Sequence, residues 1–274
     1  MSPAPEGRGS PEAEGRSAQR VSVTVDGDVG IVTLRQPPHN LLTEPVLGEV
    51  ADALHGLGGQ ARAIVLASEG RSFCAGANFR SGDAPDPTVG GGFEARTGAF
   101  YIQAARIFES PVPVVAAVQG GAIGAGFGLA LACDLRVVGA GGWFQANFVR
   151  LGIHPGFALS TVLPDMIGPG RAAELFLTGR RVPADEALAI GLAERVVAAG
   201  DEVGAALEMA QQIALGAPLA VAATRTTLRQ GLGARVRAAM RHELAEQTAL
   251  AGTADAVEGV SAVLAGRRPV FEGR

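Results

Sequence analysis

Cysteine, tryptophan and tyrosine are scarce in this chain of 274 residues, which has two Cys, one Trp and one Tyr. The two cysteines, Cys74 and Cys133, are too few for a disulfide framework and do not have the spacing of metal ligands. We therefore expect a reducing compartment, the cytoplasm, and no bound metal. A single Trp and a single Tyr also disfavour an aromatic platform for stacking bases or sugars.

Strong charge and long apolar runs are missing as well. Charged residues make up 18% of the chain and the formal net charge is -4, so no electrostatic attraction to nucleic acid or to an anionic membrane is expected. No apolar run approaches the roughly 20 residues of a membrane helix, and the N-terminus lacks an apolar signal core. We predict a soluble cytoplasmic protein with neither nucleic acid nor membrane as its partner.

Length and hydrophobicity allow a large folded unit, because 47% of the 274 residues are hydrophobic. Residues 1–20 are rich in Pro, Gly, Ser, Glu and Arg, and they cannot offset the entropy of ordering. We predict a disordered tail over 1–20, a folded core over 21–199 and a C-terminal helical region over 200–274. A role of that last region in oligomerisation or as a lid is a hypothesis from architecture alone.

Strand and helix patterns alternate along the core. The expected strands cover residues 21–25, 31–34, 63–67, 114–118 and 135–138, and the expected helices cover 44–56, 93–108, 129–133, 157–167, 170–177 and 183–190. Four further helical patterns follow at 202–215, 219–232, 234–250 and 254–264. Alternation with short connections predicts an α/β fold with a mainly parallel sheet.

The stretch 114–134 is the one around which the rest is organised. Its apolar start, Val114–Val118, has the length of a strand covered on both faces. Small residues at 124–128 then leave backbone N–H groups uncovered ahead of the expected helix 129–133. Such donors suit an anion or a developing oxyanion. Close packing of the helix on the sheet is the other interpretation of the same glycines.

A second run of small residues, Phe73–Ala77, follows the strand expected over 63–67 and again exposes backbone. With both stretches in view, the chain from about Val21 to Phe271 resembles the crotonase superfamily, also called the enoyl-CoA hydratase/isomerase family. Four segments carry the resemblance: RSFCAGANF (71–79), PVVAAVQGGAIGAGFGLALACD (113–134), LTGRRVPADEALAIGLAERVV (177–197) and ADAVEGVSAVLAGRRPVF (254–271).

The resemblance implies a spiral of repeated β-β-α turns followed by helices that build a homotrimer, often paired into a hexamer. It implies an acyl-CoA or enoyl-CoA thioester as substrate, with coenzyme A entering as part of that substrate and no separate cofactor. The oxyanion donors it implies are the N–H groups of Ala77 and Ala125. It also places Arg80, Arg267 and Arg268 near the CoA phosphates, although a solvated surface role is an equal alternative for each arginine.

The sequence departs from that family at its acid and base positions. Relatives that hydrate enoyl thioesters use two glutamates, and the aligned residues here are Gly128 and Phe148. A third position, where some relatives carry an aspartate, is Gly156. None of these side chains moves a proton, and each missing acid or base is worth roughly 10² to 10⁴ in rate. The resemblance therefore does not settle the reaction.

Few residues are candidates to replace them. His154 borders the acyl pocket of relatives, and histidine is suited to proton transfer near neutrality; a structural histidine bonded to backbone is the alternative. Glu94, Asp83 and Tyr101 lie in or just after a loop that lines the same pocket in relatives, with a plain surface role as the alternative for each. No Ser-His-Asp order or HExxH-like set supports hydrolysis.

These observations favour an enzyme that stabilises a thioester enolate in a backbone oxyanion hole, similar to enoyl-CoA hydratases and isomerases. Two alternatives stay open. The first is a non-catalytic acyl-CoA binder that kept the fold without the acid and base. The second is a decarboxylase or C–C hydrolase of the same superfamily.

Overall fold

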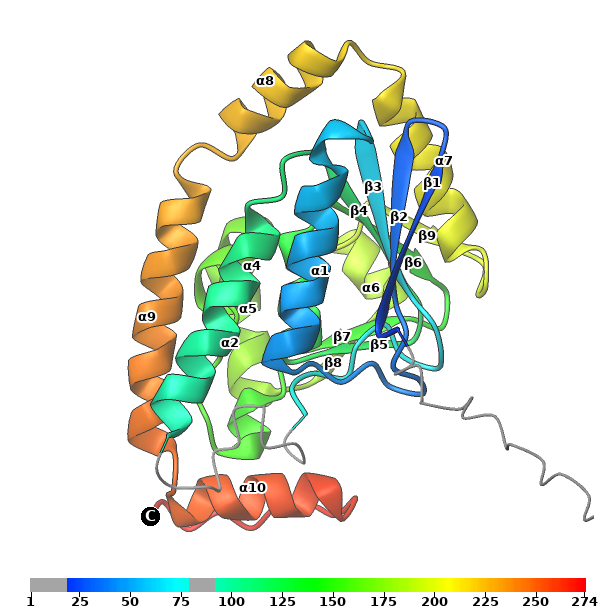
Figure 1. The fold of residues 1–274 in the computed structure, drawn as a ribbon. Helices are drawn as coiled ribbons and strands as arrows, with labels where there is room; N and C mark the ends of the chain where they lie inside the picture. The colour runs from blue at the N-terminus through cyan, green and yellow to red at the C-terminus, as the bar shows by residue number, and fades with distance from the viewer. Residues whose placement is uncertain (1–18, 79–91) are drawn as a thin grey trace, which may run out of the picture.

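The computed structural model describes residues 19–78 and 92–274, so most of the predicted tail over 1–20 lies outside the described residues. Within these described ranges, nine strands form a six-stranded sheet in the order β1-β2-β3-β4-β6-β9 and a three-stranded sheet in the order β5-β7-β8 (Figure 1). The strands are β1 (Val21–Asp26), β2 (Val29–Leu34), β3 (Ala63–Ser68), β4 (Val114–Val118), β5 (Gly121–Ile123), β6 (Leu135–Gly139), β7 (Trp143–Gln145), β8 (Arg181–Pro183) and β9 (Arg195–Val197).

Helices surround the two sheets. They are α1 (Glu44–Gly56), α2 (Phe93–Phe108), α3 (Ala125–Ala132), α4 (Leu159–Ile167), α5 (Pro169–Thr178), α6 (Ala184–Ala189), α7 (Glu202–Ala214), α8 (Pro218–Leu228), α9 (Leu232–Leu250) and α10 (Ala254–Leu264). Short 3₁₀ helices cover Leu57–Gly59 and Phe148–Leu151. The α/β class predicted from sequence is confirmed.

The larger sheet is mainly parallel, as the alternating pattern predicts. Only β1 and β2 pair antiparallel, through a hairpin that turns at Gly27 with a positive φ of 58°. The pairs β2–β3, β3–β4, β4–β6 and β6–β9 are all parallel. Because β3 and β4 are central and fully buried, their ends are held firmly, and the two small-residue segments follow from these ends.

One face of the larger sheet is covered by α7. Ala206, Ala210 and Ala214 lie one helical turn apart and pack in a buried cluster with Val65 and Ala117 of the sheet. Small side chains at this spacing let the helix approach the strands closely. The division between core and C-terminal region at 199/200 stays a prediction, and the helix directly after it lies against the sheet.

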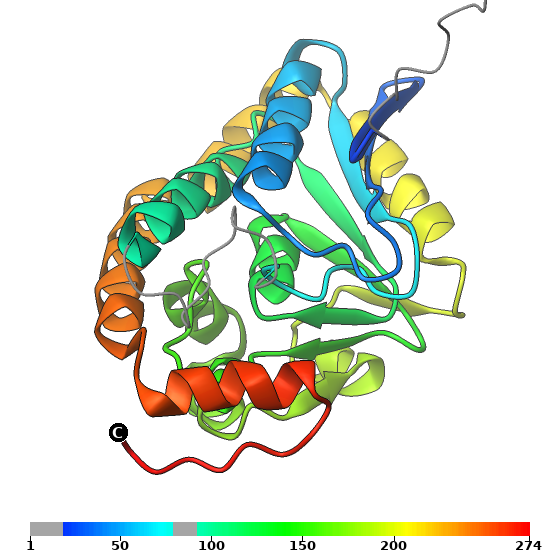
Figure 2. The same ribbon diagram turned by 60° about the horizontal axis from the view of Figure 1, so that its bottom comes forward.

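The other C-terminal helices lie around the opposite side of the molecule. In Figure 1, α8 crosses above the core and leads into α9, which runs alongside α2, while α10 lies beneath the fold, as the second view confirms (Figure 2). No residue of α8 is buried, and the side chains of Leu219 and Leu228 are 88% and 81% exposed. Two ion pairs connect α8 and its end to the core, where Asp134 binds Arg225 at 3.0 Å and Arg229 at 2.7 Å.

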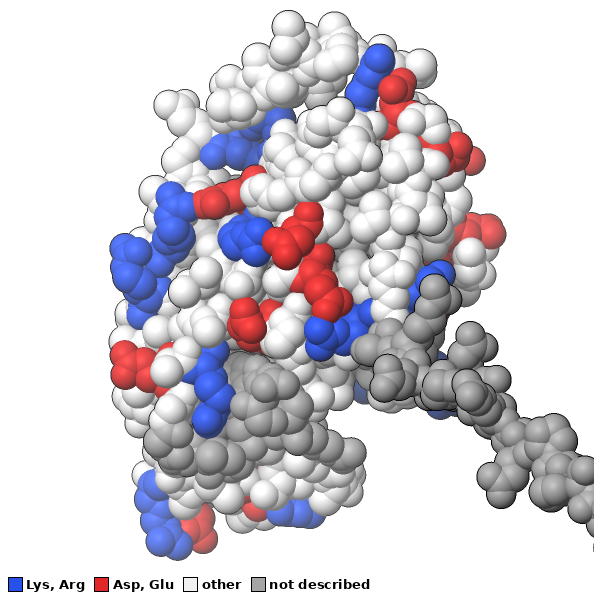
Figure 3. Space-filling model, in the orientation of Figure 1, with Lys and Arg blue, Asp and Glu red and all other residues white. Residues whose placement is uncertain are grey.

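Charge is spread over the face that carries α1, α2 and α9. Figure 3 shows arginines and acidic side chains interspersed on this face. Several pair across helices, as Arg106 of α2 does with Asp52 of α1 at 2.5 Å. This distribution gives no single-sign patch on the described residues of that face.

Two helix starts differ from the expected positions, and four strands have no counterpart among the expected elements. The helix predicted at 129–133 begins four residues earlier, at Ala125, and the helix predicted from Pro183 begins at Ala184, because Pro183 ends β8. The three-residue strands β5, β7, β8 and β9 were not predicted, since three residues are too few to display a strand period. These short strands matter, because Ile123 of β5 and Trp143 and Gln145 of β7 line a groove described below.

Residues 19–78 and 92–274 contain neither a single membrane-spanning helix nor a metal-binding cluster. No single helix there is long and apolar enough to cross a membrane, whereas α7 and α8 meet the length and composition test only as a pair bent by 108°. No group of three or more His, Cys, Asp or Glu within those ranges could hold a metal ion.

Candidate active site

The two small-residue segments meet side by side. The Cys74 N–H donates to Gly121 O at 3.1 Å, and the Ile123 N–H donates to Cys74 O at 2.9 Å. Two residues further along both segments, a Cβ placed on Gly76 would lie 3.8 Å from the Ala125 nitrogen. The segment after β3 and the start of α3 are therefore in van der Waals contact.

The Ala77 N–H points away from its neighbouring strand. Leu42 bridges to Ala77 in a parallel arrangement, in which the Leu42 N–H donates to Gly76 O at 2.8 Å and the Asn78 N–H donates to Leu42 O at 2.9 Å. Backbone groups of an extended chain alternate in direction. Since Gly76 and Asn78 face Leu42, the N–H of Ala77 faces the opposite side, where Ala77 lines a cavity.

Ala125 is the first residue of α3 and also lines that cavity. Its N–H has no acceptor within the helix, because the first N–H groups of a helix have no carbonyl one turn before them. The preceding Gly124 adopts a positive φ of 53° and has no side chain to cap the helix. Two backbone donors, on Ala77 and Ala125, are thus brought to one cavity.

Gly126 makes this approach possible. A Cβ on Gly126 would lie 2.1 Å from the carbonyl oxygen of Cys74, a distance that no side chain tolerates. The glycine within the first turn of α3 is therefore explained by contact with the other segment, as the close-packing interpretation expects. Close packing and a pair of exposed donors are consequences of the same contact.

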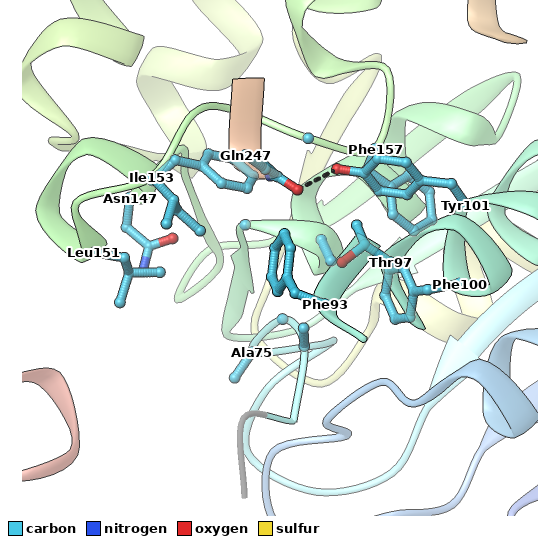
Figure 4. Close-up of a pocket in the computed structure, with 16 residues that line it drawn as sticks. Ala75, Phe93, Thr97, Phe100, Tyr101, Asn147, Leu151, Ile153, Phe157 and Gln247 are labelled. Atoms are coloured by element: carbon cyan, nitrogen blue, oxygen red, sulfur yellow. Dashed lines mark hydrogen bonds between the residues drawn. The ribbon is translucent and has the colours of Figure 1, made fainter. Parts of the chain in front are cut away.

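The cavity is small, about 60 Å³, and mostly apolar (Figure 4). Phe93, Phe100, Phe148 and Phe157 form much of its wall, and the Phe100 and Phe157 rings meet edge to face with centroids 6.1 Å apart. The other described residues that line it are Ala75, Gly76, Ala77, Thr97, Tyr101, Gly124, Ala125, Asn147, Leu151, Ile153, Gly156 and Gln247.

There is no room for a carboxylate side chain at residue 128, the first position at which the sequence departs from the family pattern. A Cβ on Gly128 would lie 2.5 Å from the Cβ of Phe157, so the Phe157 side chain occupies this space. At the second position the Phe148 ring itself lines the cavity and is 6% exposed. Both positions at which the family resemblance implies a glutamate are therefore apolar here.

At the third such position, Gly156, the side chains of Tyr101 and Gln247 occupy the space that a side chain would need. A Cβ on Gly156 would lie 2.1 Å from the Tyr101 hydroxyl oxygen and 2.7 Å from Gln247 Nε2. The Tyr101 hydroxyl donates to Gln247 Oε1 at 2.9 Å, and Gln247 Nε2 donates to the carbonyl oxygen of His154 at 2.8 Å. Burial, and secondarily the Glu243 carboxylate, raises the pKa of Tyr101 well above its ordinary value, while interactions with the Phe157 backbone and Gln247 act in the opposite direction. Tyr101 is therefore a neutral phenol at pH 7.

Glu243 of α9 accepts hydrogen bonds from the chain segment that follows Phe157. Its fully buried carboxylate accepts from the Ala158 N–H at 2.7 Å, the Ser160 N–H at 3.0 Å and the Ser160 hydroxyl at 2.6 Å. It thereby caps the first turn of α4, a role that helix starts usually leave to a residue of their own segment. Burial raises the pKa of Glu243, while these hydrogen bonds act in the opposite direction.

The side chain of His154 does not line the cavity among the described residues. The ring is half-buried, its Nδ1 lies 2.7 Å from the carbonyl oxygen of Pro155, and it meets the His242 ring edge to face at 5.6 Å. Only the backbone carbonyl of His154 joins the network of Gln247. Glu94 is exposed on α2, and Asp83 lies outside the described residues. The acid and base role predicted for His154 stays a prediction.

A groove of about 1,200 Å³ adjoins the cavity and shares Ala75, Ala77, Asn147 and Leu151 with it. The cations that line it are Arg150, Arg181, Arg267 and Arg268, and none of its described lining residues is an Asp or Glu. Arg80 lies outside the described residues. The structure thus brings two of the three predicted arginines to this groove and adds two that were not predicted.

The arginines of the groove differ in how they are held. Arg267 pairs with Glu258 at 2.7 Å, and this contact lowers the pKa of the Glu258 carboxyl to about 2. Arg181 stacks over Trp143 with its guanidinium carbon 3.9 Å from the ring centroid, and Arg150 donates to Thr178 O at 3.1 Å. Neither Arg150 nor Arg181 pairs with an acidic side chain in the described parts of the chain.

A spiral of strands and helices with two small-residue segments meeting at a cavity defines the crotonase class of proteins. The family model for enoyl-CoA hydratase/isomerase matches residues 24–274. The chain therefore belongs to the enoyl-CoA hydratase/isomerase family.

Similar proteins agree with this assignment over nearly the whole chain. A "Probable enoyl-CoA hydratase" of Rhodobacter capsulatus is 34% identical over 262 residues, covering 94% of this chain and all of that relative. A carnitinyl-CoA dehydratase of Proteus mirabilis is 34% identical over 268 residues with the same two coverages. A crystal structure of an enoyl-CoA hydratase/isomerase from Pseudoalteromonas atlantica superposes with a TM-score of 0.80 at 29% identity, covering 93% of this chain and 100% of that one.

Proposed function

We propose that this protein binds acyl-CoA or enoyl-CoA thioesters and stabilises an enolate of the acyl group. In this proposal the thioester oxygen accepts hydrogen bonds from the N–H groups of Ala77 and Ala125. The observation that carries it is the meeting of these two donors at one cavity that adjoins a groove lined by four arginines. A thioester would place its acyl group in the cavity and its phosphates in the groove.

The two donors supply electrostatic stabilisation without a metal or a separate cofactor. As a base, solvent water or His154 in this proposal, takes a proton from the α-carbon, negative charge accumulates on the thioester oxygen. Donors already in position stabilise this charge without reorganising. A single donor of this kind is worth roughly 10² to 10³ in rate. Coenzyme A takes part only as a portion of the substrate.

The arginines support the phosphate end of the proposal. The guanidinium group suits phosphate because it presents several N–H donors in a fixed plane. Arg150 and Arg181 are the better candidates, since Arg267 is already paired with Glu258. Arg80 and Arg268 stay in the proposal as further cations.

The reaction itself resembles that of enoyl-CoA hydratases and isomerases, with proton exchange at the α-carbon as its first step. Efficient hydration is disfavoured, because Gly128 and Phe148 stand where relatives carry glutamates. That same apolar wall favours one alternative, a protein that binds acyl-CoA without turning it over. The two proposals differ in whether the α-proton is exchanged.

Deuterium exchange separates them. The protein is incubated in D₂O with butyryl-CoA and but-3-enoyl-CoA, which both carry acidic α-protons, and the mass of each recovered thioester is followed. Enolate formation predicts a gain in mass at the α-carbon. Binding without exchange supports the non-catalytic alternative, and absence of both binding and exchange overturns the proposal.

Ala125→Pro tests the donor itself. Proline lacks the N–H but fits the first position of a helix, which Ala125 occupies. We expect exchange to fall by about 10² to 10³. Ala184→Pro places proline at the first position of α6 as a matched control and should leave exchange unchanged.

We also propose that copies of this chain assemble as a trimer or hexamer in the cytoplasm. The exposed side chains of Leu219 and Leu228 on α8 support assembly, since large apolar groups on one helix otherwise face water. Sedimentation of the wild type and of Leu219→Glu tests the assembly. A monomer in both samples would contradict it.

A further inference from the structure

One end of the cavity is polar, although most of its wall is apolar. Thr97 and Tyr101 lie one helical turn apart on the same face of α2, and Gln247 reaches them from α9 (Figure 4). All three side chains line the cavity, with exposed fractions of 1% for Thr97, 7% for Tyr101 and 5% for Gln247. Polar groups buried this deeply in an aromatic cavity require partners.

Thr97 has none. Its hydroxyl oxygen is buried and makes no hydrogen bond to any residue in the described ranges, not even to the carbonyl one turn before it in α2. An unpaired buried hydroxyl costs free energy, which a ligand recovers if it pairs with the group. The Thr97 hydroxyl is therefore free to donate to, or accept from, a group in the cavity.

The direction of the Tyr101 hydroxyl is set by Gln247. Because Gln247 Nε2 donates to His154 O at 2.8 Å, the other side of the amide, Oε1, faces Tyr101. The phenol hydrogen therefore points at Gln247, and the phenol oxygen is left to accept. The phenol oxygen can accept two hydrogen bonds. The Phe157 backbone N–H uses one of these positions, so one acceptor position remains.

A hydroxyl group complements this pair. Its hydrogen donates to the Tyr101 oxygen while its own oxygen accepts from Thr97. A keto oxygen accepts from Thr97 but gives nothing to Tyr101, and an alkyl chain leaves both groups unpaired. The small cavity, about 60 Å³, restricts such a ligand to a short chain.

We propose that Thr97 and Tyr101 bind the hydroxyl group of a short hydroxyacyl thioester, with Gln247 positioning the phenol. This inference rests on the proposed function, because the thioester must first enter the cavity. Neither side chain is suited to proton transfer, since the raised pKa makes the neutral Tyr101 phenol a weak acid and no base, and threonine does not titrate. The hydroxyl is therefore recognised and retained on the acyl chain rather than eliminated.

Calorimetry with matched thioesters tests this specificity. The ligands are butyryl-CoA, 3-hydroxybutyryl-CoA, 4-hydroxybutyryl-CoA and acetoacetyl-CoA. We expect at least one hydroxybutyryl thioester to bind the wild type about fivefold to 25-fold more tightly than butyryl-CoA, since one neutral hydrogen bond corresponds to about fivefold in affinity. Acetoacetyl-CoA should fall between them.

Two variants remove the proposed partners one at a time. Thr97→Val and Tyr101→Phe keep the approximate shape of each side chain, and each should reduce the preference for the hydroxyl by about fivefold while leaving butyryl-CoA affinity nearly unchanged. Thr248→Val is the matched control, because its hydroxyl is also buried without a partner but Thr248 does not line the cavity. This control should retain the full preference.

The outcomes separate the two levels of the inference. If butyryl-CoA binds at least as tightly as both hydroxybutyryl thioesters, the hydroxyl site is overturned while the proposed function stands. A preference that survives in both Thr97→Val and Tyr101→Phe overturns it as well. If no CoA ester binds at all, the proposed function fails and this site fails with it.

Discussion

The Tyr101 hydroxyl occupies the space that any side chain on residue 156 would need, since a Cβ on Gly156 would lie 2.1 Å from its oxygen. Glycine at position 156 therefore makes room for the polar Tyr101 hydroxyl in the cavity. A side chain at 156 requires the Tyr101 hydroxyl to shift.

Gly156→Ala should consequently destabilise the fold by about 1–3 kcal/mol, the usual cost of overpacking. Adding Tyr101→Phe should recover part of that loss, because the nearest remaining ring atom, Cζ, lies 3.3 Å from the added Cβ. Urea unfolding of the two single variants and the double variant measures the coupling. Gly98→Ala, whose Cβ would meet only Leu244 Cδ2 at 3.8 Å, is the control and should not destabilise. Strict additivity of the two substitutions would contradict the steric relationship.

Gly126→Ala should separate the two segments that hold the Ala77 and Ala125 donors. The added Cβ would lie 2.1 Å from Cys74 O, which is backbone and cannot rotate away. We expect thioester exchange to fall at least tenfold, with a loss of stability of about 1–3 kcal/mol. Gly204→Ala in α7 meets nothing within 4 Å and should gain stability instead. Wild-type exchange in a folded Gly126→Ala protein would argue against a role of this contact in positioning the donors.

Glu243 should make stability fall as pH rises. Burial raises its pKa above the ordinary value of 4.5, so the native state holds a proton that the unfolded chain releases. Its contribution is fully present below the unfolded pKa and is lost as pH rises through the folded pKa. Urea midpoints measured from pH 4 to pH 7 should decline less in Glu243→Gln than in wild type. The exposed Glu246→Gln serves as the control and should keep the wild-type slope.

Arg150→Gln and Arg181→Gln should each weaken CoA-thioester binding several-fold, and more at low than at high salt, because the groove contacts are electrostatic. The same variants should bind an acyl-pantetheine thioester, which has no nucleotide phosphates, as tightly as wild type does. Arg235→Gln, which removes an exposed partner of Asp165 on another surface, is the matched control. An equal loss with the pantetheine ligand would mean that these arginines support the fold and not the phosphates.

The sequence was sufficient for the parts of the site that depend on local backbone. Small residues at 73–77 and 124–128 indicate exposed N–H groups, and both segments do reach one cavity. The start of α3 was missed because glycine is a weak helix former. Gly126 and Gly128 are in the helix for tertiary reasons, namely contacts with Cys74 and Phe157 that a linear pattern does not contain.

The polar end of the cavity was beyond sequence reasoning for a different reason. The sequence makes Tyr101 a candidate, but the orientation of its hydroxyl depends on Gln247, 146 residues further along the chain. The spacing of Thr97 and Tyr101 on a predicted helix could have indicated a shared face. Nothing in the sequence indicates that this face meets α9. The same holds for Arg150 and Arg181, which come to one groove from the 3₁₀ helix Phe148–Leu151 and from strand β8.

Helix α9 supplies both Glu243, which caps α4, and Gln247, which holds the Tyr101 phenol. Docking of α9 and occupancy of the cavity are therefore thermodynamically linked. A ligand that binds only the docked form stabilises it by RT ln(1 + [L]/Kd). Amide hydrogens in α9 and in the first turn of α4 should accordingly exchange more slowly with solvent in the presence of a bound thioester, even though the backbone of α9 does not line the groove.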